Sequence, residues 1–128
     1  MSASVADDGV VASGVCVVEV AEAERLLASG GAGVWSDGEL LYARERVDPA
    51  RRLAARLAAK RATCRLLGGD AVEREVEVRR GAFGPPSLRL AGAAEARMRA
   101  LGASRALVSL THERTHAAAL VVFVRDGR

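Results

Sequence analysis

The two ends of the chain carry short apolar runs typical of strands, whereas the middle carries the longer periodicity of helices. Residues 10–20 are mostly β-branched and apolar, which predicts a buried strand. Residues 106–110 and 117–124 predict two further strands near the C-terminus. The other expected elements, in chain order, are a helix at 21–29, a helix from 37 to about 46, a helix at 49–67, strands at 72–80 and 87–90, and a helix at 93–101. Strands at both ends with helices between them predict an α+β fold.

Capping residues mark where two of the helices are expected to begin. Ser36 is expected to cap the helix that follows it, and Glu39 three residues later completes a capping box. Asp48 and Pro49 suit the cap and the first turn of the helix at 49–67, which a pair of glycines ends.

The helix at 49–67 carries a basic stripe beside an apolar one. Arg52, Arg56 and Lys60 follow one another at intervals of four residues, and like charges at this spacing slightly destabilise a helix. A solvated basic face explains the stripe. A site for the phosphates or carboxylates of an anionic partner, nucleic acid included, explains it as well, and both interpretations stay open at this point.

Composition narrows the class of protein. The 128 residues suggest one domain, at 10–128 after a flexible tail at 1–9. A net charge of +3 with only 3% aromatic residues argues against a nucleic-acid partner. Cys16 and Cys64 are expected as free thiols in a reducing compartment. The N-terminus lacks the basic region of a signal peptide, and the apolar run at 117–124 is too short to span a bilayer, so we expect a cytoplasmic protein without a membrane partner.

A histidine and a glutamate stand directly after the apolar strand at 106–110. Thr111, His112 and Glu113 follow that strand, and strand ends often carry chemistry because a rigid scaffold holds an exposed loop there. A lone histidine is more often structural or solvated. Position alone therefore leaves the role of His112 open.

Four segments, taken together, resemble one enzyme family. The family's opening strand and helix are similar to residues 16–27, CVVEVAEAERLL, and its R-F-A-A-K-E-A helix is similar to residues 56–62, RLAAKRA. Its S-x-S-H-E turn and final strand are similar to SLTHE at 109–113 followed by AAALVV, and its G-K-P segment is similar to 84–86. In order, spacing and length the match covers nearly the whole chain after the tail. The chain thus resembles the holo-acyl-carrier-protein synthase type of phosphopantetheinyl transferase.

The resemblance implies a fold, a reaction and partners. The fold would be a compact α+β structure, with a small mixed or antiparallel sheet packed against helices. The protein would form a homotrimer with its sites at the subunit interfaces, although a hetero-oligomer stays open. The reaction would move phosphopantetheine from coenzyme A to a serine of an acyl carrier protein with the help of Mg²⁺, in fatty-acid or polyketide biosynthesis.

The resemblance also implies which side chains surround coenzyme A or its phosphopantetheine group. They are basic and hydroxyl side chains of the helix at 49–67 and of the segment after the strand at 106–110. The expected set is Arg52, Arg56, Lys60, Ser109, Thr111 and His112.

The chain departs from the family at the metal site. Family members hold Mg²⁺ with an Asp in the opening strand and a Glu after A-A-K, where this chain has Cys16 and Arg61. The Lys of G-K-P is replaced by Pro85. A thiol is a poor ligand for Mg²⁺, which prefers hard oxygen atoms, and Arg61 brings a positive charge instead. Metal binding of the family's kind is therefore not expected.

Three hypotheses follow for the reaction. In the first, transfer persists without that metal, and Arg61 holds the pyrophosphate directly. In the second, the fold acts on an acyl or polyketide chain tethered to the carrier, with Cys16 and His112 as nucleophile and base, or as an acid–base pair for dehydration or cyclisation. In the third, the protein is a carrier-binding subunit without catalytic activity. Cys16 also fits a plain role as a small buried residue on a strand.

Overall fold

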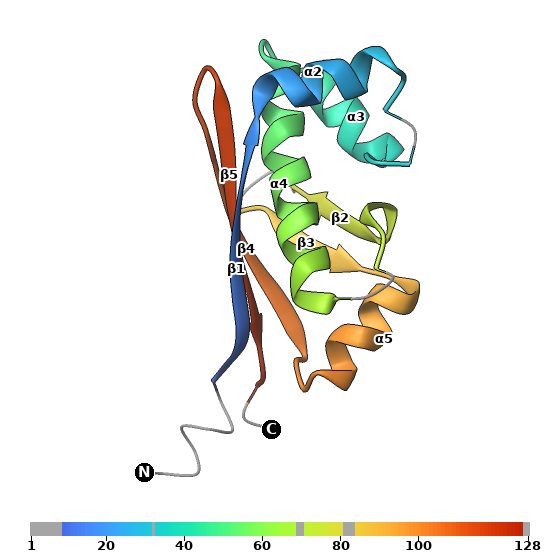
Figure 1. Ribbon diagram of the computed structural model, residues 1–128, viewed down its shortest axis with the longest axis vertical. Coiled ribbons are helices and arrows are strands. Elements are labelled where there is room, and N and C mark those ends of the chain that lie inside the picture. The colour runs from blue at the N-terminus through green and yellow to red at the C-terminus, as the bar shows by residue number, and fades with distance from the viewer. Residues whose placement is uncertain (1–8, 32, 69–70, 81–83, 127–128) are drawn as a thin grey trace.

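The computed structural model describes residues 9–31, 33–68, 71–80 and 84–126. Most of the tail expected at 1–9 lies outside this range. The elements in chain order are β1 (Val10–Glu19), α2 (Val20–Ala28), α3 (Asp37–Arg44), α4 (Pro49–Leu67), the 3₁₀ turn η1 (Glu73–Glu75), β2 (Val76–Arg79), β3 (Ser87–Leu90), α5 (Gly92–Ala100), β4 (Arg105–His112) and β5 (His116–Val124). This arrangement confirms the predicted α+β fold (Figure 1).

Two antiparallel sheets form the β part of the molecule. The larger has the strand order β1-β5-β4, and the smaller is the hairpin of β2 and β3. β5 is central, because its Ala119 lies opposite Cys16 of β1 on one side and Leu110 of β4 on the other. Helix α4 lies against one face of the larger sheet, and the hairpin and the other helices lie beyond it (Figure 1).

Helix α4 is the central element of the fold. Pro49 occupies its first turn, and it ends at Gly68, whose φ of 71° suits a residue without a Cβ. Its alanines from Ala54 to Ala62 are buried, so the strand backbones approach the helix closely. The helix is therefore packed around most of its circumference and fixes the positions of its charged side chains.

That packing decides between the two interpretations of the basic stripe for two of its three residues. Arg52 stays partly exposed, whereas Arg56 is 3% exposed and Lys60 is 0% exposed, so these two do not lie on a solvated face. Both side chains lie in the space between α4, α3 and the hairpin, where they have protein partners described below.

Three local features also differ from their predictions. Asp48 does not cap α4 with its side chain; its carboxylate instead pairs with Arg51 and Arg52, at 3.7 and 3.3 Å. The strand expected at 72–80 begins only at Val76, because η1 occupies the preceding residues. β4 extends through His112, so this histidine is the last residue of a strand and not part of a loop.

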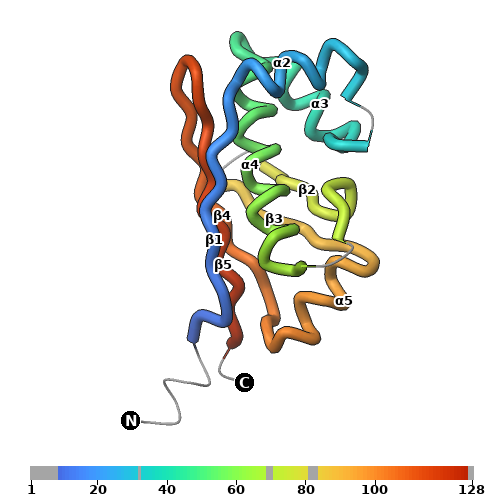
Figure 2. The backbone as a smooth tube through the Cα atoms, viewed as in Figure 1, coloured from blue at the N-terminus to red at the C-terminus, as the bar shows by residue number. Residues whose placement is uncertain are grey.

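No described element covers the face of the larger sheet that points away from α4 (Figure 2). Val15 and Val17 of β1 are each 61% exposed there, and Leu107 and Leu120 on the neighbouring strands are also exposed. We call this surface the outer sheet face. Within the described ranges, none of the helices is long and apolar enough to cross a membrane.

Candidate functional site

A cavity of about 300 Å³ lies between α3, the first half of α4 and the end of β4. Cationic and polar side chains dominate its walls. The lining residues are Tyr42, Arg52, Ala55, Arg56, Arg80, Leu110, Thr111 and His112. We call it the arginine–histidine cavity. Four of the six residues expected around coenzyme A line this cavity, namely Arg52, Arg56, Thr111 and His112, although Thr111 alternates with His112 along β4 and is on the same face of the strand as Ser109.

Two nitrogen atoms at this cavity are buried without a hydrogen-bond partner among the described residues. They are Nε of Arg56 and Nδ1 of His112. A buried polar atom left in this state costs about 1–3 kcal/mol, so proteins nearly always satisfy such atoms. Both residues line the same cavity, so an anion with several acceptor oxygens there would lie next to both side chains.

The environment of Tyr42 shows that the cavity is strongly cationic. The guanidinium groups of Arg46 and Arg56 lie 4.1 and 4.2 Å from the centre of its ring. Burial raises the pKa of the Tyr42 hydroxyl, but the interaction with Arg46 and the charges of Arg56 and Arg52 outweigh burial and lower the pKa overall. Burial also lowers the pKa of Arg56, since water solvates its charge poorly. An anion in the cavity would stabilise this charge.

Lys60 does not line the cavity. Its Nζ atom is 2.8 Å from Oε1 of Glu39, and it donates hydrogen bonds to the carbonyl oxygens of Val76 and Glu73. Its contacts are therefore with α3, η1 and the start of β2. This geometry suits a residue that positions the cavity walls rather than one that binds phosphate.

Glu39 is the ionic partner of Lys60, and the sequence did not predict this pairing. Its carboxylate accepts hydrogen bonds from the backbone N–H groups of Ser36 and Val78, each at 2.8 Å. The capping box with Ser36 was predictable and is present. The buried contact with Lys60 was not, because the two residues lie on different helices and only the fold brings them together.

The two positions where the resemblance implies metal ligands do not fit Mg²⁺. Cys16 is 3% exposed and belongs to the hydrophobic core, and its thiol is a soft ligand. The guanidinium of Arg61 donates to both carboxylate oxygens of Glu22, with Nη1 3.0 Å from Oε1. In the part of the chain that the structure describes, no group of three or more His, Cys, Asp or Glu side chains could hold a metal ion.

Cys16 and His112 do not meet within one chain. They lie on β1 and β4, with β5 between them, and two strand spacings amount to roughly 10 Å. Ser109 is also apart from His112, because its exposed side chain alternates with those that face α4 and therefore points to the outer sheet face.

A second cavity, of about 390 Å³, lies at the other end of α4. Arg61 and Arg65 line it together with Cys64, Gly68, Ala71 and Glu73. The hydrogen bonds to Glu22 raise the pKa of Arg61 against the opposing effect of burial, and nearby Cys16 and Glu73 add to the rise. We call this the Arg61 cavity.

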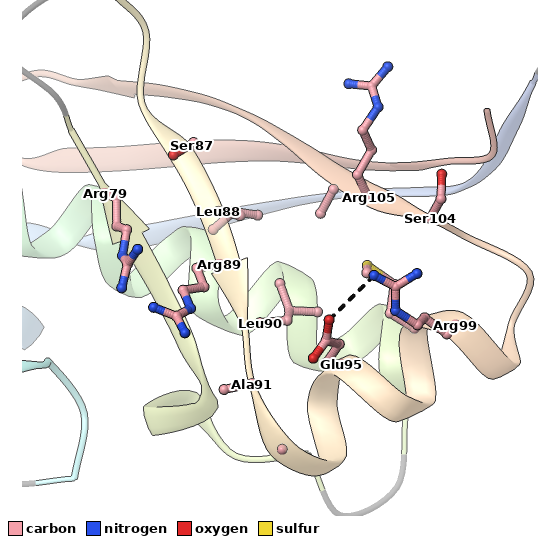
Figure 3. A pocket seen from close by; sticks show the side chains of 13 residues that line it. Arg79, Ser87, Leu88, Arg89, Leu90, Ala91, Glu95, Arg99, Ser104 and Arg105 are labelled. Atoms are coloured by element: carbon pink, nitrogen blue, oxygen red, sulfur yellow. Dashed lines mark hydrogen bonds and ion pairs between the residues drawn. The ribbon is translucent and has the colours of Figure 1, made fainter.

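A third cavity, of about 430 Å³, is lined by the β2–β3 hairpin, α5 and the start of β4 (Figure 3). It also contains arginines, but Arg99 pairs with Glu95 at 3.4 Å and Arg105 pairs with Asp126 at 3.1 Å. Neither of the two unpartnered buried nitrogens found in the described residues lies here. This cavity therefore has no comparable need for a ligand.

Comparisons with known proteins agree on one family. A protein of Thermus thermophilus named holo-[acyl-carrier-protein] synthase is 42% identical over 124 residues, which cover 93% of this chain and 97% of that protein. The crystal structure of holo-[acyl-carrier-protein] synthase from Neisseria meningitidis is 26% identical with a TM-score of 0.73, covering 89% of this chain and 98% of that one. A Bacillus anthracis holo-(acyl-carrier-protein) synthase in complex with CoA (3',5'-ADP) shares the fold, with a TM-score of 0.74, 21% identity, and coverage of 91% and 98%. No protein-family model matches the chain.

Proposed function

Since the chain belongs to the holo-[acyl-carrier-protein] synthase family, we propose that it binds coenzyme A and transfers the phosphopantetheine group to an acyl carrier protein. The observation that carries this proposal is that Arg56 and His112, the two side chains with unpartnered buried nitrogens, line one cationic cavity. Coenzyme A carries three phosphate groups, and phosphate oxygens accept strong hydrogen bonds from guanidinium groups. The arginine–histidine cavity is accordingly the proposed phosphate site.

Transfer would join the carrier serine oxygen to the phosphorus that bears the pantetheine arm, and 3',5'-ADP would leave. Charge on the phosphate oxygens grows in such a reaction, and fixed cationic groups stabilise it. Arg52, Arg56 and Arg80 meet this requirement from the walls of the cavity. Biosynthesis of fatty acids is the setting that this reaction would serve.

The proposed active form is a trimer of this chain. The outer sheet face is apolar and uncovered in the single chain, which supports burial against further copies. Arg61 and His112 line different cavities in one chain, so a site that uses both requires a neighbouring subunit. No geometry within one chain favours a Cys16–His112 pair for dehydration or cyclisation.

The proposal is tested by measuring coenzyme A binding by titration calorimetry. His112→Ala and Arg56→Gln each remove one of the unpartnered donors or acceptors, so each is expected to weaken binding by about 10-fold or more. Arg99→Gln is the matched control, because it removes an arginine from the third cavity, and it should leave binding unchanged. Unchanged affinity in the first two variants, or equal losses in all three, would refute the phosphate site.

A further inference from the structure

The Arg61–Glu22 pair stands where the resemblance implies a divalent cation, and the donor atoms there do not fit one. We infer that the diphosphate of coenzyme A binds without a divalent cation, and that the guanidinium of Arg61, held in place by Glu22, supplies the fixed positive charge next to the arginine–histidine cavity of a neighbouring subunit. The inference rests on the proposed function, since it concerns the same ligand.

The geometry of the pair leaves Arg61 able to bind a second anion. Its Nη1 and Nη2 atoms each donate one hydrogen to Glu22. A guanidinium carries five N–H groups, so Nε–H and one hydrogen on each terminal nitrogen remain free for another acceptor. The side chain is 32% exposed and lines the Arg61 cavity, so a ligand can approach these hydrogens.

Glu22 holds the guanidinium of Arg61 in a fixed position, as carboxylate ligands would hold a metal ion. It lies in the first turn of α2, which packs against α4. The hydrogen bond from Arg61 lowers the pKa of Glu22, so the carboxylate stays ionised at neutral pH.

The net charge of the side chains at the Arg61 cavity equals that of a site with two carboxylates and a divalent cation. Arg61 and Arg65 are balanced by Glu22 and Glu73, so the group is formally neutral. Two carboxylates with one divalent cation are neutral as well. A cation added beside Arg61 would meet a permanent like charge, because arginine does not lose its proton in proteins.

The first test compares coenzyme A binding by the wild-type chain in excess EDTA and in excess MgCl₂. The affinities are expected to agree within about twofold, and Arg61→Gln should weaken binding by about 10-fold in both buffers. Arg105→Gln is the matched control, because Arg105 is also an exposed arginine paired with a carboxylate, and it should change neither affinity.

Binding that appears only with Mg²⁺ would overturn the inference and leave the proposed function standing. An Arg61→Gln variant that binds as tightly as the wild type would also overturn it. Absence of binding in both buffers would overturn the proposed function itself.

A second test uses Mn²⁺ and electron paramagnetic resonance without coenzyme A. The wild type should leave Mn²⁺ free in solution, whereas Arg61→Glu places a second carboxylate beside Glu22 and should bind the ion. Tight Mn²⁺ binding by the wild type would contradict the inference. If Arg61→Glu does not fold, the comparison of coenzyme A binding by the wild type in EDTA and in MgCl₂ still tests the inference.

Discussion

Arg56 and His112 are the residues on which the proposed function depends most. Each contributes a buried nitrogen without a partner to the same cavity. Residue type alone would not have singled out Arg56 from the other seventeen arginines of the chain. Its burial, its missing partner and its position over Tyr42 do so.

Glu113 provides a pH-dependent prediction at the same scale. In the turn after β4 its carboxylate accepts hydrogen bonds from the Thr115 hydroxyl and from the backbone N–H groups of Thr115 and His116. The hydroxyl bond is the largest of the effects that lower the pKa of Glu113 to about 2. Because this folded-state pKa lies below the unfolded value, the stabilisation is fully present above about pH 4.5 and is lost as the pH falls towards 2.

Thr115→Val removes the hydroxyl donor and should raise the pKa of Glu113 towards its ordinary value, as measured by an NMR titration of the side chain. Thr111→Val, on the preceding strand, serves as the control and should leave that pKa unchanged. An unaltered Glu113 titration in Thr115→Val would show that the hydroxyl bond does not exist in solution.

At the scale of the elements, a buried ion pair joins α4, α3 and the β2–β3 hairpin. Lys60 and Glu39 are almost completely buried, and their remaining hydrogen bonds go to backbone groups of η1, β2 and the start of α3. These elements carry Tyr42 and Arg80, which form walls of the arginine–histidine cavity. The Lys60–Glu39 pair therefore fixes the relative positions of the elements that form the cavity walls.

Lys60→Met leaves the Glu39 carboxylate buried without its cation, and we expect a loss of about 3–5 kcal/mol in the free energy of unfolding. Urea unfolding measures this loss. The double variant Lys60→Met/Glu39→Gln removes the uncompensated charge and should recover part of the stability. Losses that simply add would indicate that the two side chains do not interact.

Much of this element structure was predictable from the sequence. The bounds of α4 and β3 match their predictions, because a proline, a glycine pair and a clear apolar pattern mark them. The burial of Arg56 and Lys60 was not predictable, since helical spacing shows which residues share a face but not what covers it. Helix α3 and the β2–β3 hairpin cover Arg56 and Lys60, and only the tertiary structure fixes the positions of these elements.

The candidate site was predictable only in part for the same reason. Motif spacing selected His112 and Arg56, which do meet at one cavity. It also grouped Cys16 with His112, which do not meet within one chain because β5 separates β1 from β4; a pairing across subunits stays a prediction. Motif spacing missed Glu22, the partner of Arg61, because only the packing of α2 against α4 brings the two together.

For the whole molecule, the outer sheet face determines the expected assembly. Val17→Glu places a charge on that apolar surface, so the proposed trimer should dissociate to monomers, as measured by light scattering after size-exclusion chromatography. Val47→Glu is the control, because Val47 is fully exposed in the segment before α4 and away from the sheet. A monomeric wild type, or a trimeric Val17→Glu variant, would contradict the proposed assembly.

The most direct test of the account is the intact mass of an apo acyl carrier protein after incubation with this protein and coenzyme A. We expect the carrier to gain one phosphopantetheinyl group, the gain to persist in EDTA, and Arg56→Gln and His112→Ala to slow it strongly. An unchanged carrier mass, while a holo-[acyl-carrier-protein] synthase of known activity modifies the same preparation, would contradict the account.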